Sequence, residues 1–539
     1  MKRVVLVMLV FCFFTSSYSQ PRPKLVVGMM VDQMRWDYLY RYADRYGTGG
    51  FKRLLREGFS CEHAFIPYTP TYTAAGHASV YTGSVPALHG IAGNNWYDKV
   101  MRRSVYCTED DSVRTVGSSS TAGKQSPKNL WANTISDEMR ISTNFRSKTI
   151  AVALKDRGSI LPGGHSANGA YWFDATNGAF ITSTYYMPAL PRWVTDFNDR
   201  KLPDAYLAKT WNTLYPTATY VQSGKDSAHY ELPLPGEDVT FDHHTESVTG
   251  NRYESFKYTP GANTYTFDMA KAAIAGEGLG KGPQTDMLAV SFSAPDYIGH
   301  NFGPNSIEVE DMYLRFDRDL ALFLNHLDAT VGKGQYLIFL TADHGVAQVP
   351  GFLAEHRLPG GTLDDALIRK ALNDSIKTAF GITNAIEYTI NYQVYLNESE
   401  LQTWKGDRGS LKEYIIRQLL RYPGVSHAFD LGIIGSAPLP AHLKEMMSNG
   451  YNQKRSGDIQ FSLKPQWFDG GSRGTTHGSW NPYDAHIPVI FFGMGIKPGK
   501  TYREVYMTDI APTVAALLRI QMPNAAIGKV IGEVMSLAK

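Results

Sequence analysis

Three largely apolar runs, each closely followed by an acidic side chain, constrain the fold of this chain most. The runs cover residues 25–31, 287–292 and 336–340, and Asp32, Asp296 and Asp343 lie just beyond them. A continuous apolar run of this length is typical of a strand that is buried on both faces, as in a parallel sheet. Ligands bind at the carboxyl ends of strands in open α/β sheets. We therefore expect an α/β fold with acidic groups gathered at one edge of the sheet.

Further helical and strand patterns follow in the alternating order that is typical of α/β proteins. Helical patterns cover residues 36–45, 50–57, 74–81, 307–327, 363–380, 411–422 and 508–518. Strand patterns cover residues 61–66, 179–182, 387–396 and 487–492. Residues from about 95 to 280 are rich in Tyr, Thr, Ser, Asn and Gly and predict a loop-rich cap over the edge of the sheet. Residues from about 360 to 464 predict a large insertion.

The first 19 residues have the pattern of a signal peptide. Lys2 and Arg3 precede an apolar run over residues 4–14, which is too short to span a bilayer. We expect residues 20–539 to form one exported catalytic domain, periplasmic or secreted, without a membrane span. The formal net charge of +2 and the lack of a Lys/Arg-rich run argue against nucleic-acid binding.

Export would leave two cysteines in the mature chain, Cys61 and Cys107. An oxidising compartment permits one disulfide between them. Two buried thiols are an equally good interpretation.

An uncharged stretch over residues 70–79 surrounds Thr73. This threonine comes directly before a helical pattern and is predicted to cap the helix. The N-terminus of a helix suits a phosphate group, because its free N–H groups point outward and its dipole is positive there. A threonine hydroxyl held at this point becomes a nucleophile if a metal ion lowers its pKa.

Histidines accompany the acidic residues at the predicted strand ends. Asp296 and His300 are four residues apart, which places them on one face of a helical turn or compact loop. His344 directly follows Asp343, and His477 lies in a Gly-flanked loop. Three carboxylates and three imidazoles form the mixture of ligands that suits zinc.

With these motifs the chain resembles the alkaline phosphatase superfamily and, more narrowly, the monomeric phosphate-irrepressible alkaline phosphatases of the PafA type. The matching motifs are residues 31–33, 71–77, 93–98, 155–157, Asp296 with His300, 341–345, 475–479 and 509–513. The resemblance implies a central, mostly parallel sheet with helices on both faces. It also implies a monomeric enzyme that hydrolyses small phosphate monoesters and holds two zinc ions per chain.

The resemblance also implies a role for each site residue. One zinc ion would be held by Asp296, His300 and His477, and the other by Asp32, Asp343, His344 and the oxygen of Thr73. Thr73 would be the nucleophile and would form a phospho-threonine. Asn94 and the Thr73 N–H would bind one phosphoryl oxygen, and Lys155 and Arg157 the others.

Lys155 and Arg157 are expected to select monoesters, because a monoester dianion carries more charge on its free oxygens than a diester does. Two cations at positions i and i+2 point the same way from an extended segment, which is how we expect them to lie. Lysine acts as a point charge and arginine adds a directional fork.

Other histidines and polar residues near these motifs compete for a role. We expect His77 to be structural, and Asn95, Asp98 and His165 are candidate supporting residues. His486 could replace His477 as a ligand, but it directly precedes a buried strand, so His477 is preferred.

Three other functions compete with a phosphomonoesterase. A nucleotide pyrophosphatase/phosphodiesterase-like enzyme would share the zinc ligands, the threonine and the asparagine, but it is not expected to carry Lys155 and Arg157. A sulfatase would need a Cys or Ser in a Cys/Ser-x-Pro-x-Arg motif, which the Thr73 segment lacks. A non-catalytic exported protein that binds phosphate or metal should have lost a ligand or the nucleophile, and none is missing here.

Overall fold

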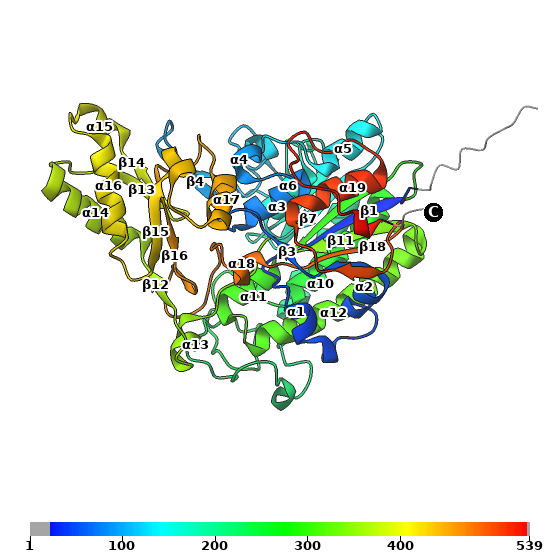
Figure 1. Ribbon diagram of the computed structural model, residues 1–539. Coiled ribbons are helices and arrows are strands. Elements are labelled where there is room, and N and C mark those ends of the chain that lie inside the picture. Colours follow the sequence, from blue (N-terminus) through cyan, green and yellow to red (C-terminus); the bar gives the residue numbers. More distant parts are fainter. Residues whose placement is uncertain (1–21, 536–539) are drawn as a thin grey trace, which may run out of the picture.

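A computed structural model describes residues 22–535 of the chain. The expected signal peptide, residues 1–19, lies outside the described residues. The centre of the structure is a ten-stranded sheet with the strand order β19-β2-β18-β11-β1-β10-β7-β8-β9-β6 (Figure 1). In that order the strands are Gly499–Thr501, Phe59–Cys61, Val489–Gly493, Tyr336–Thr341, Leu25–Val31, Asp286–Phe292, Thr149–Ala153, Gly169–Asp174, Ala179–Ser183 and Thr115–Val116.

The middle of the sheet is parallel, as the apolar runs predicted. Strands β11, β1, β10, β7 and β8 are adjacent and run in the same direction. All residues of these five strands are buried. Antiparallel strands β18 and β9 flank this centre. The carboxyl ends of the five central strands therefore meet at one edge of the sheet.

Helices cover both faces of the sheet, which confirms the predicted fold class (Figure 1). One face carries α3 (Thr73–Thr82), α5 (Ile135–Ser142), α6 (Asp156–Gly163) and α19 (Ile510–Leu518). The other carries α2 (Phe51–Glu57), α10 (Gly261–Glu277) and α12 (Ile307–Leu327). The long helix α12 has the bounds that its apolar periodicity predicted. The helical pattern at residues 36–45 forms only two short pieces, α1 (Tyr38–Arg41) and a 3₁₀ turn.

The region from about 95 to 280 differs from the predicted cap. Four of its strands, β7, β8, β9 and β6, belong to the central sheet rather than covering its edge. Only the β4 (Asn95–Asp98) and β5 (Arg103–Tyr106) hairpin pairs outside that sheet. Strand β7 has the sequence Thr-Ile-Ala-Val-Ala, in which three β-branched residues favour a strand, but the run is short and lies within a polar, Gly-rich region.

The predicted insertion forms a unit with its own small sheet, set to the left of the main sheet in Figure 1. The sheet consists of β13 (Ile386–Ile390), β14 (Gln393–Leu396), β16 (Ile459–Leu463) and β15 (Val425–Asp430). Helices α14 (Asp365–Phe380) and α16 (Arg408–Leu419) pack on it around a separate apolar cluster. The predicted single strand over 387–396 is a hairpin, because Asn391 and Tyr392 have φ values of 58° and 57° and turn the chain back.

The two cysteines of the described chain are both free and buried. Cys61 packs in the main core, whereas Cys107 belongs to a separate cluster beside α3. Of the two interpretations that the sequence left open, the structure has the pair of buried thiols. Burial raises the pKa of each thiol to about 12, so both stay protonated at neutral pH.

Helix α3 lies so close to the end of β11 that only a glycine fits at the contact. A Cβ atom on Gly76 would stand 2.5 Å from the Cβ of Asp343 and 2.6 Å from its carbonyl oxygen. This contact fixes the N-terminus of α3, and with it Thr73, against the strand end that carries Asp343 and His344.

We predict that Gly76→Ala destabilises the protein by about 1–3 kcal/mol, because the added methyl group meets backbone that cannot move freely. The midpoint of thermal unfolding should fall. Gly282→Ala is the control, because a Cβ at Gly282 has no atom within 4 Å. Equal midpoints for the two variants would contradict the close contact between α3 and β11.

Candidate active site

Four adjacent parallel strands deliver the charged side chains of the predicted site. Asp343 and His344 follow β11, Asp32 follows β1, Asp296 and His300 follow β10, and Lys155 follows β7. The backbone keeps this register beyond the strands, since the Asp32 N–H donates to the carbonyl of Phe292, the last residue of β10. Sheet topology alone thus brings together residues that lie as far apart in the sequence as Asp32 and Asp343.

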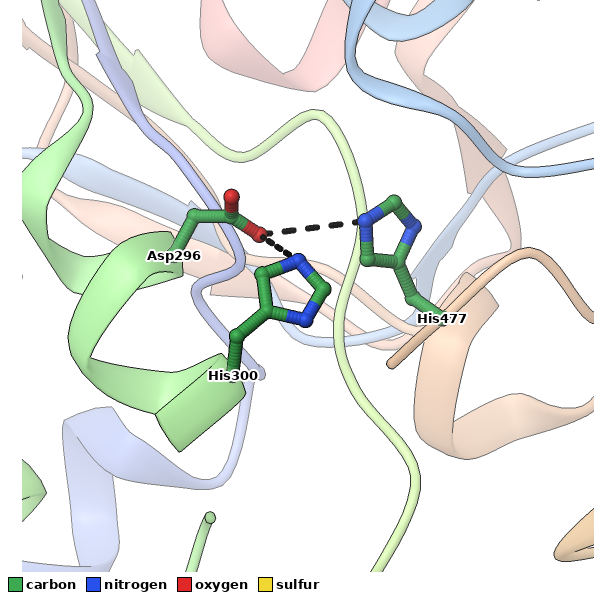
Figure 2. Close-up of side chains that lie close together, drawn as sticks. All are labelled: Asp296, His300 and His477. Carbon is green, nitrogen blue, oxygen red and sulfur yellow. Dashed lines mark ion pairs between the residues drawn. The ribbon is translucent and has the colours of Figure 1, made fainter. Parts of the chain in front are cut away.

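Asp296, His300 and His477 form one group of possible metal ligands (Figure 2). Asp296 and His300 lie one turn apart on α11 (Ala294–Phe302), and His300 Nε2 is 3.1 Å from Asp296 Oδ1. His477 comes from the loop before α18 (Pro482–Ala485), and its Nε2 is 3.8 Å from the same oxygen. The spacing of Asp296 and His300 predicted this shared helical face.

A second group of possible ligands consists of Asp32, Asp296 and His344. His344 Nε2 lies 3.5 Å from Asp32 Oδ1 and also 3.5 Å from Asp343 Oδ2. Asp343 therefore adjoins this group, as the sequence predicted, and all four side chains are buried. Asp296 takes part in both groups, so the two groups are contiguous.

The three histidines present the same nitrogen to the site. His300 Nδ1 pairs with the carbonyl of Thr475 at 2.7 Å, and His477 Nδ1 with the carbonyl of Thr71 at 2.7 Å. His344 Nδ1 pairs with the carbonyl of Gly345 at 3.0 Å. Because a carbonyl only accepts, each Nδ1 carries a proton, and in the neutral ring Nε2 keeps its lone pair. This arrangement is typical of histidines that bind a metal ion.

Two carboxylate oxygens at the site lack a hydrogen-bond donor among the described residues. They are Asp32 Oδ1 and Asp343 Oδ2, and both are buried. A buried charged oxygen without a partner is costly, and a cation removes that cost. The donor set of imidazole nitrogens and carboxylate oxygens fits a divalent metal such as zinc.

The Lys155 ammonium is the buried counter-charge at the centre of the site. Its Nζ donates to Asp32 Oδ2 at 2.7 Å and to Asp296 Oδ2 at 2.6 Å. Burial lowers the pKa of Lys155, but the two carboxylates outweigh it and raise that pKa above its ordinary value. Burial would raise the pKa of Asp296, but His300 and Lys155 hold it well below its usual range. Burial and the neighbouring Asp343 raise the pKa of Asp32.

Thr73 lies at the N-terminus of α3, beside the second group. It is the first residue of the helix rather than its cap, a position that Tyr72 occupies. Its Oγ1 is 3.2 Å from His344 Nε2. The side chain of Asn94 accepts a hydrogen bond from the Ala74 N–H at 2.9 Å, which brings this predicted phosphate-binding residue next to Thr73.

Arg157 lies near Lys155, but not on an extended segment as predicted. Lys155 is the N-cap of α6, and Arg157 is in the first turn of that helix. Because the backbone changes from strand to helix after β7, the prediction that the two side chains point the same way from an extended segment was wrong. Both cations still lie at the carboxyl end of the strand. Arg157 Nη1 donates to the hydroxyl of Tyr106 at 2.9 Å. Burial lowers the pKa of Arg157, but the neighbouring phenols raise it well above its usual value.

The remaining sequence candidates lie outside the ligand groups. Both ring nitrogens of His77 form structural hydrogen bonds, one with the carbonyl of Thr73 and the other with the hydroxyl of Ser291. His486 stacks on Trp36 and pairs with the carbonyl of Glu62. Asn95 and Asp98 lie on strand β4, and His165 pairs with Asp137 and the carbonyl of Leu130.

Gln33 is a site residue that the sequence reasoning did not single out. Its Nε2 donates to Asp296 Oδ1 at 2.7 Å, and its backbone N–H donates to Asp343 Oδ1 at 3.1 Å. Its φ of 63° turns the chain directly after Asp32. Its signal in the sequence was its place in the motif of residues 31–33, next to a strand-end aspartate.

Comparison with known proteins assigns this constellation to a family. A family model described as type I phosphodiesterase / nucleotide pyrophosphatase matches residues 26–484. Alkaline phosphatase PhoV of Synechococcus elongatus is 52% identical over 95% of this chain and 93% of its own. Alkaline phosphatase PafA of Elizabethkingia meningoseptica is 49% identical over 96% and 95%. The crystal structure of PafA covers 96% of this chain and 99% of its own with a TM-score of 0.93.

The chain belongs to the PafA-type alkaline phosphatases, within the type I phosphodiesterase / nucleotide pyrophosphatase family. This confirms the resemblance that the motifs indicated and the prediction of a phosphatase. A further relative, from Myroides odoratus, is 51% identical over 97% of both chains and is named a calcium-transporting ATPase. Among residues 22–535 of this phosphatase, no helix has the length and hydropathy of a membrane span.

We predict that His477→Ala weakens metal binding by more than about tenfold and removes most phosphatase activity, because it deletes one ligand of the first group. Metal content after dialysis and the rate on 4-nitrophenyl phosphate measure this. His486→Ala is the matched control and should keep both. If His486→Ala lost the metal and His477→Ala kept it, the ligand assignment would be wrong.

Proposed function

We propose that this phosphatase hydrolyses phosphate monoesters through a phosphorylated Thr73 and that it holds two zinc ions per chain. One zinc site would consist of Asp296, His300 and His477, and the other of Asp32, Asp343, His344 and the oxygen of Thr73. Bound zinc would act as a Lewis acid that lowers the pKa of the threonine hydroxyl and stabilises the departing oxygen. The unpartnered oxygens of Asp32 and Asp343 support metal binding.

The observation that carries this proposal is the position of the Thr73 hydroxyl. It is held at the N-terminus of α3 and lies 3.2 Å from His344 Nε2, at the margin of the second ligand group. A helix N-terminus stabilises the negative charge of a bound phosphoryl group. A hydroxyl at this point can attack phosphorus, and water can later release the phosphate from the threonine.

The chain's own residues would hold the phosphoryl group. Asn94 and the Thr73 N–H would bind one free oxygen, and Lys155 and Arg157 the other two. In the structure Lys155 is paired with Asp32 and Asp296. The proposal therefore requires its ammonium to exchange carboxylate oxygens for phosphoryl oxygens when metal ions neutralise the carboxylates.

The choice between monoesters and diesters rests on the same two cations. A diester has one free charged oxygen fewer to pair with Lys155 and Arg157, so the pair favours the dianion of a monoester. Relatives near 50% identity carry the name alkaline phosphatase, which supports the monoesterase over the diesterase. We also propose an exported monomer, in the periplasm or secreted, on the pattern of residues 1–19.

We predict that Thr73→Ala lowers turnover by more than about a thousandfold while metal stays bound, because the nucleophile is lost but Asp32, Asp343 and His344 remain as ligands of the second site. Thr73→Ser should keep measurable activity, since it retains a hydroxyl. Rates on 4-nitrophenyl phosphate and metal content are measured for each variant, and acid quenching with labelled substrate tests for phospho-threonine in the wild type. Undiminished turnover in Thr73→Ala would rule out this nucleophile.

We predict that Lys155→Ala/Arg157→Ala lowers the rate on 4-nitrophenyl phosphate about a hundredfold more than the rate on the bis ester. The physical reason is the loss of two charge-assisted contacts that only the dianion makes fully. Arg192→Ala/Lys225→Ala changes the net charge equally at two exposed positions and is the control. Equal losses on both substrates would contradict the assigned substrate class.

A further inference from the structure

An open cavity of about 570 Å³ lies between the segments around Tyr72 and Asn94, on one side, and the insertion, on the other. Tyr72 and Asn94 line it on one side, and Asp365, Tyr388 and Tyr392 line it on the other. Tyr72 directly precedes Thr73, and Asn94 holds the N–H of Ala74. The cavity is therefore lined by the residue before Thr73 and by the asparagine that contacts the first turn of α3.

Residues of the insertion that line the cavity are held by contacts with Asn95 and Tyr97 of strand β4. Asn391 Nδ2 donates to the carbonyl of Asn95 at 2.8 Å. The rings of Tyr97 and Tyr388 stack with their centroids 5.1 Å apart. These contacts hold the far side of the cavity at a fixed distance from Thr73.

Tyr72, one of the residues that line the cavity, contacts a candidate metal ligand. The ring of Tyr72 meets the ring of His477 edge-on, with centroids 5.7 Å apart.

The charge of the lining is negative. Asp364, Asp365 and Asp469 contribute three carboxylates, against one guanidinium from Arg369, which lies over the ring of Tyr388. Asp365 Oδ1 is buried and has no hydrogen-bond partner among the described residues. Burial, Asp469 and Asp364 raise the pKa of Asp365 to about 7, so this group is ionised at alkaline pH.

We propose that this cavity binds the leaving group of the substrate and that it favours alcohols carrying an ammonium group. The inference rests on the proposed function, because the ester group must sit beside Asn94 for the rest of the substrate to enter the cavity. An ammonium would be attracted by the carboxylates of Asp364, Asp365 and Asp469 and would lie among tyrosine rings, which attract cations. A leaving group with a second anionic charge would be repelled.

Two alkyl phosphates of equal size separate charge from shape in the test. 3-Aminopropyl phosphate and n-butyl phosphate differ only in whether the chain ends in an ammonium or a methyl group. Asp365→Asn removes the charge at nearly constant shape. Asp374→Asn is the matched control, because Asp374 lies on the same helix α14 and is 67% exposed beside Lys370.

We expect Asp365→Asn to lower kcat/KM for 3-aminopropyl phosphate about tenfold and to leave kcat/KM for n-butyl phosphate unchanged. Asp374→Asn should change neither. Equal losses on both substrates, or no loss on either, would overturn the leaving-group assignment. A wild-type enzyme that hydrolyses neither substrate, nor 4-nitrophenyl phosphate, would instead contradict the proposed function.

Discussion

The whole structure depends on holding three carboxylates close together out of contact with water. Asp32, Asp296 and Asp343 follow three adjacent parallel strands, so the sheet forces their charges to one point. Burial and mutual repulsion make such a group unfavourable unless cations compensate it. The Lys155 ammonium supplies one positive charge, and the free oxygens of Asp32 and Asp343 leave room for more. The need for cations and the capacity to bind phosphate thus arise from one arrangement.

Rigid contacts surround this charged centre and fix its geometry. Gly76 lets α3 approach the backbone of Asp343, which sets the position of the Thr73 hydroxyl. Backbone carbonyls accept the Nδ1 protons of His300, His344 and His477, so the rings cannot rotate without losing a hydrogen bond. The insertion has its own apolar cluster. The hydrogen bond from Asn391 to Asn95 holds its edge beside the site, where it forms one wall of the cavity. The ends of the central strands therefore supply most of the candidate ligands, α3 supplies Thr73, and the insertion supplies one wall of the cavity beside the site.

Much of the fold could be read from local patterns. The long amphipathic pattern at 307–327 gave the bounds of α12, and the apolar runs gave strands β1, β10 and β11. The spacing of Asp296 and His300 indicated their shared helical face because it depends only on local geometry. Strand β7 was missed because it is a short run within a polar, Gly-rich region, although Thr149, Ile150 and Val152 favour a strand, and its burial depends on neighbours from distant parts of the chain. Because strand β7 was missed, the segment from Lys155 to Arg157 was predicted to be extended, whereas it forms the start of helix α6.

The sequence by itself determined the class of fold, the chemical types at the strand ends and the family, because apolar periodicity and motif order are local properties of the chain. Only the tertiary structure decided which strands are neighbours, and hence which carboxylates share a cation. It also chose His477 over His486, since the first faces Asp296 and the second stacks on Trp36. It added Gln33 and the cavity at the insertion, which no spacing indicates. Contacts between residues that are hundreds of positions apart in the sequence depend on the register of the sheet. That register exists only in the folded chain, so local sequence patterns do not show it.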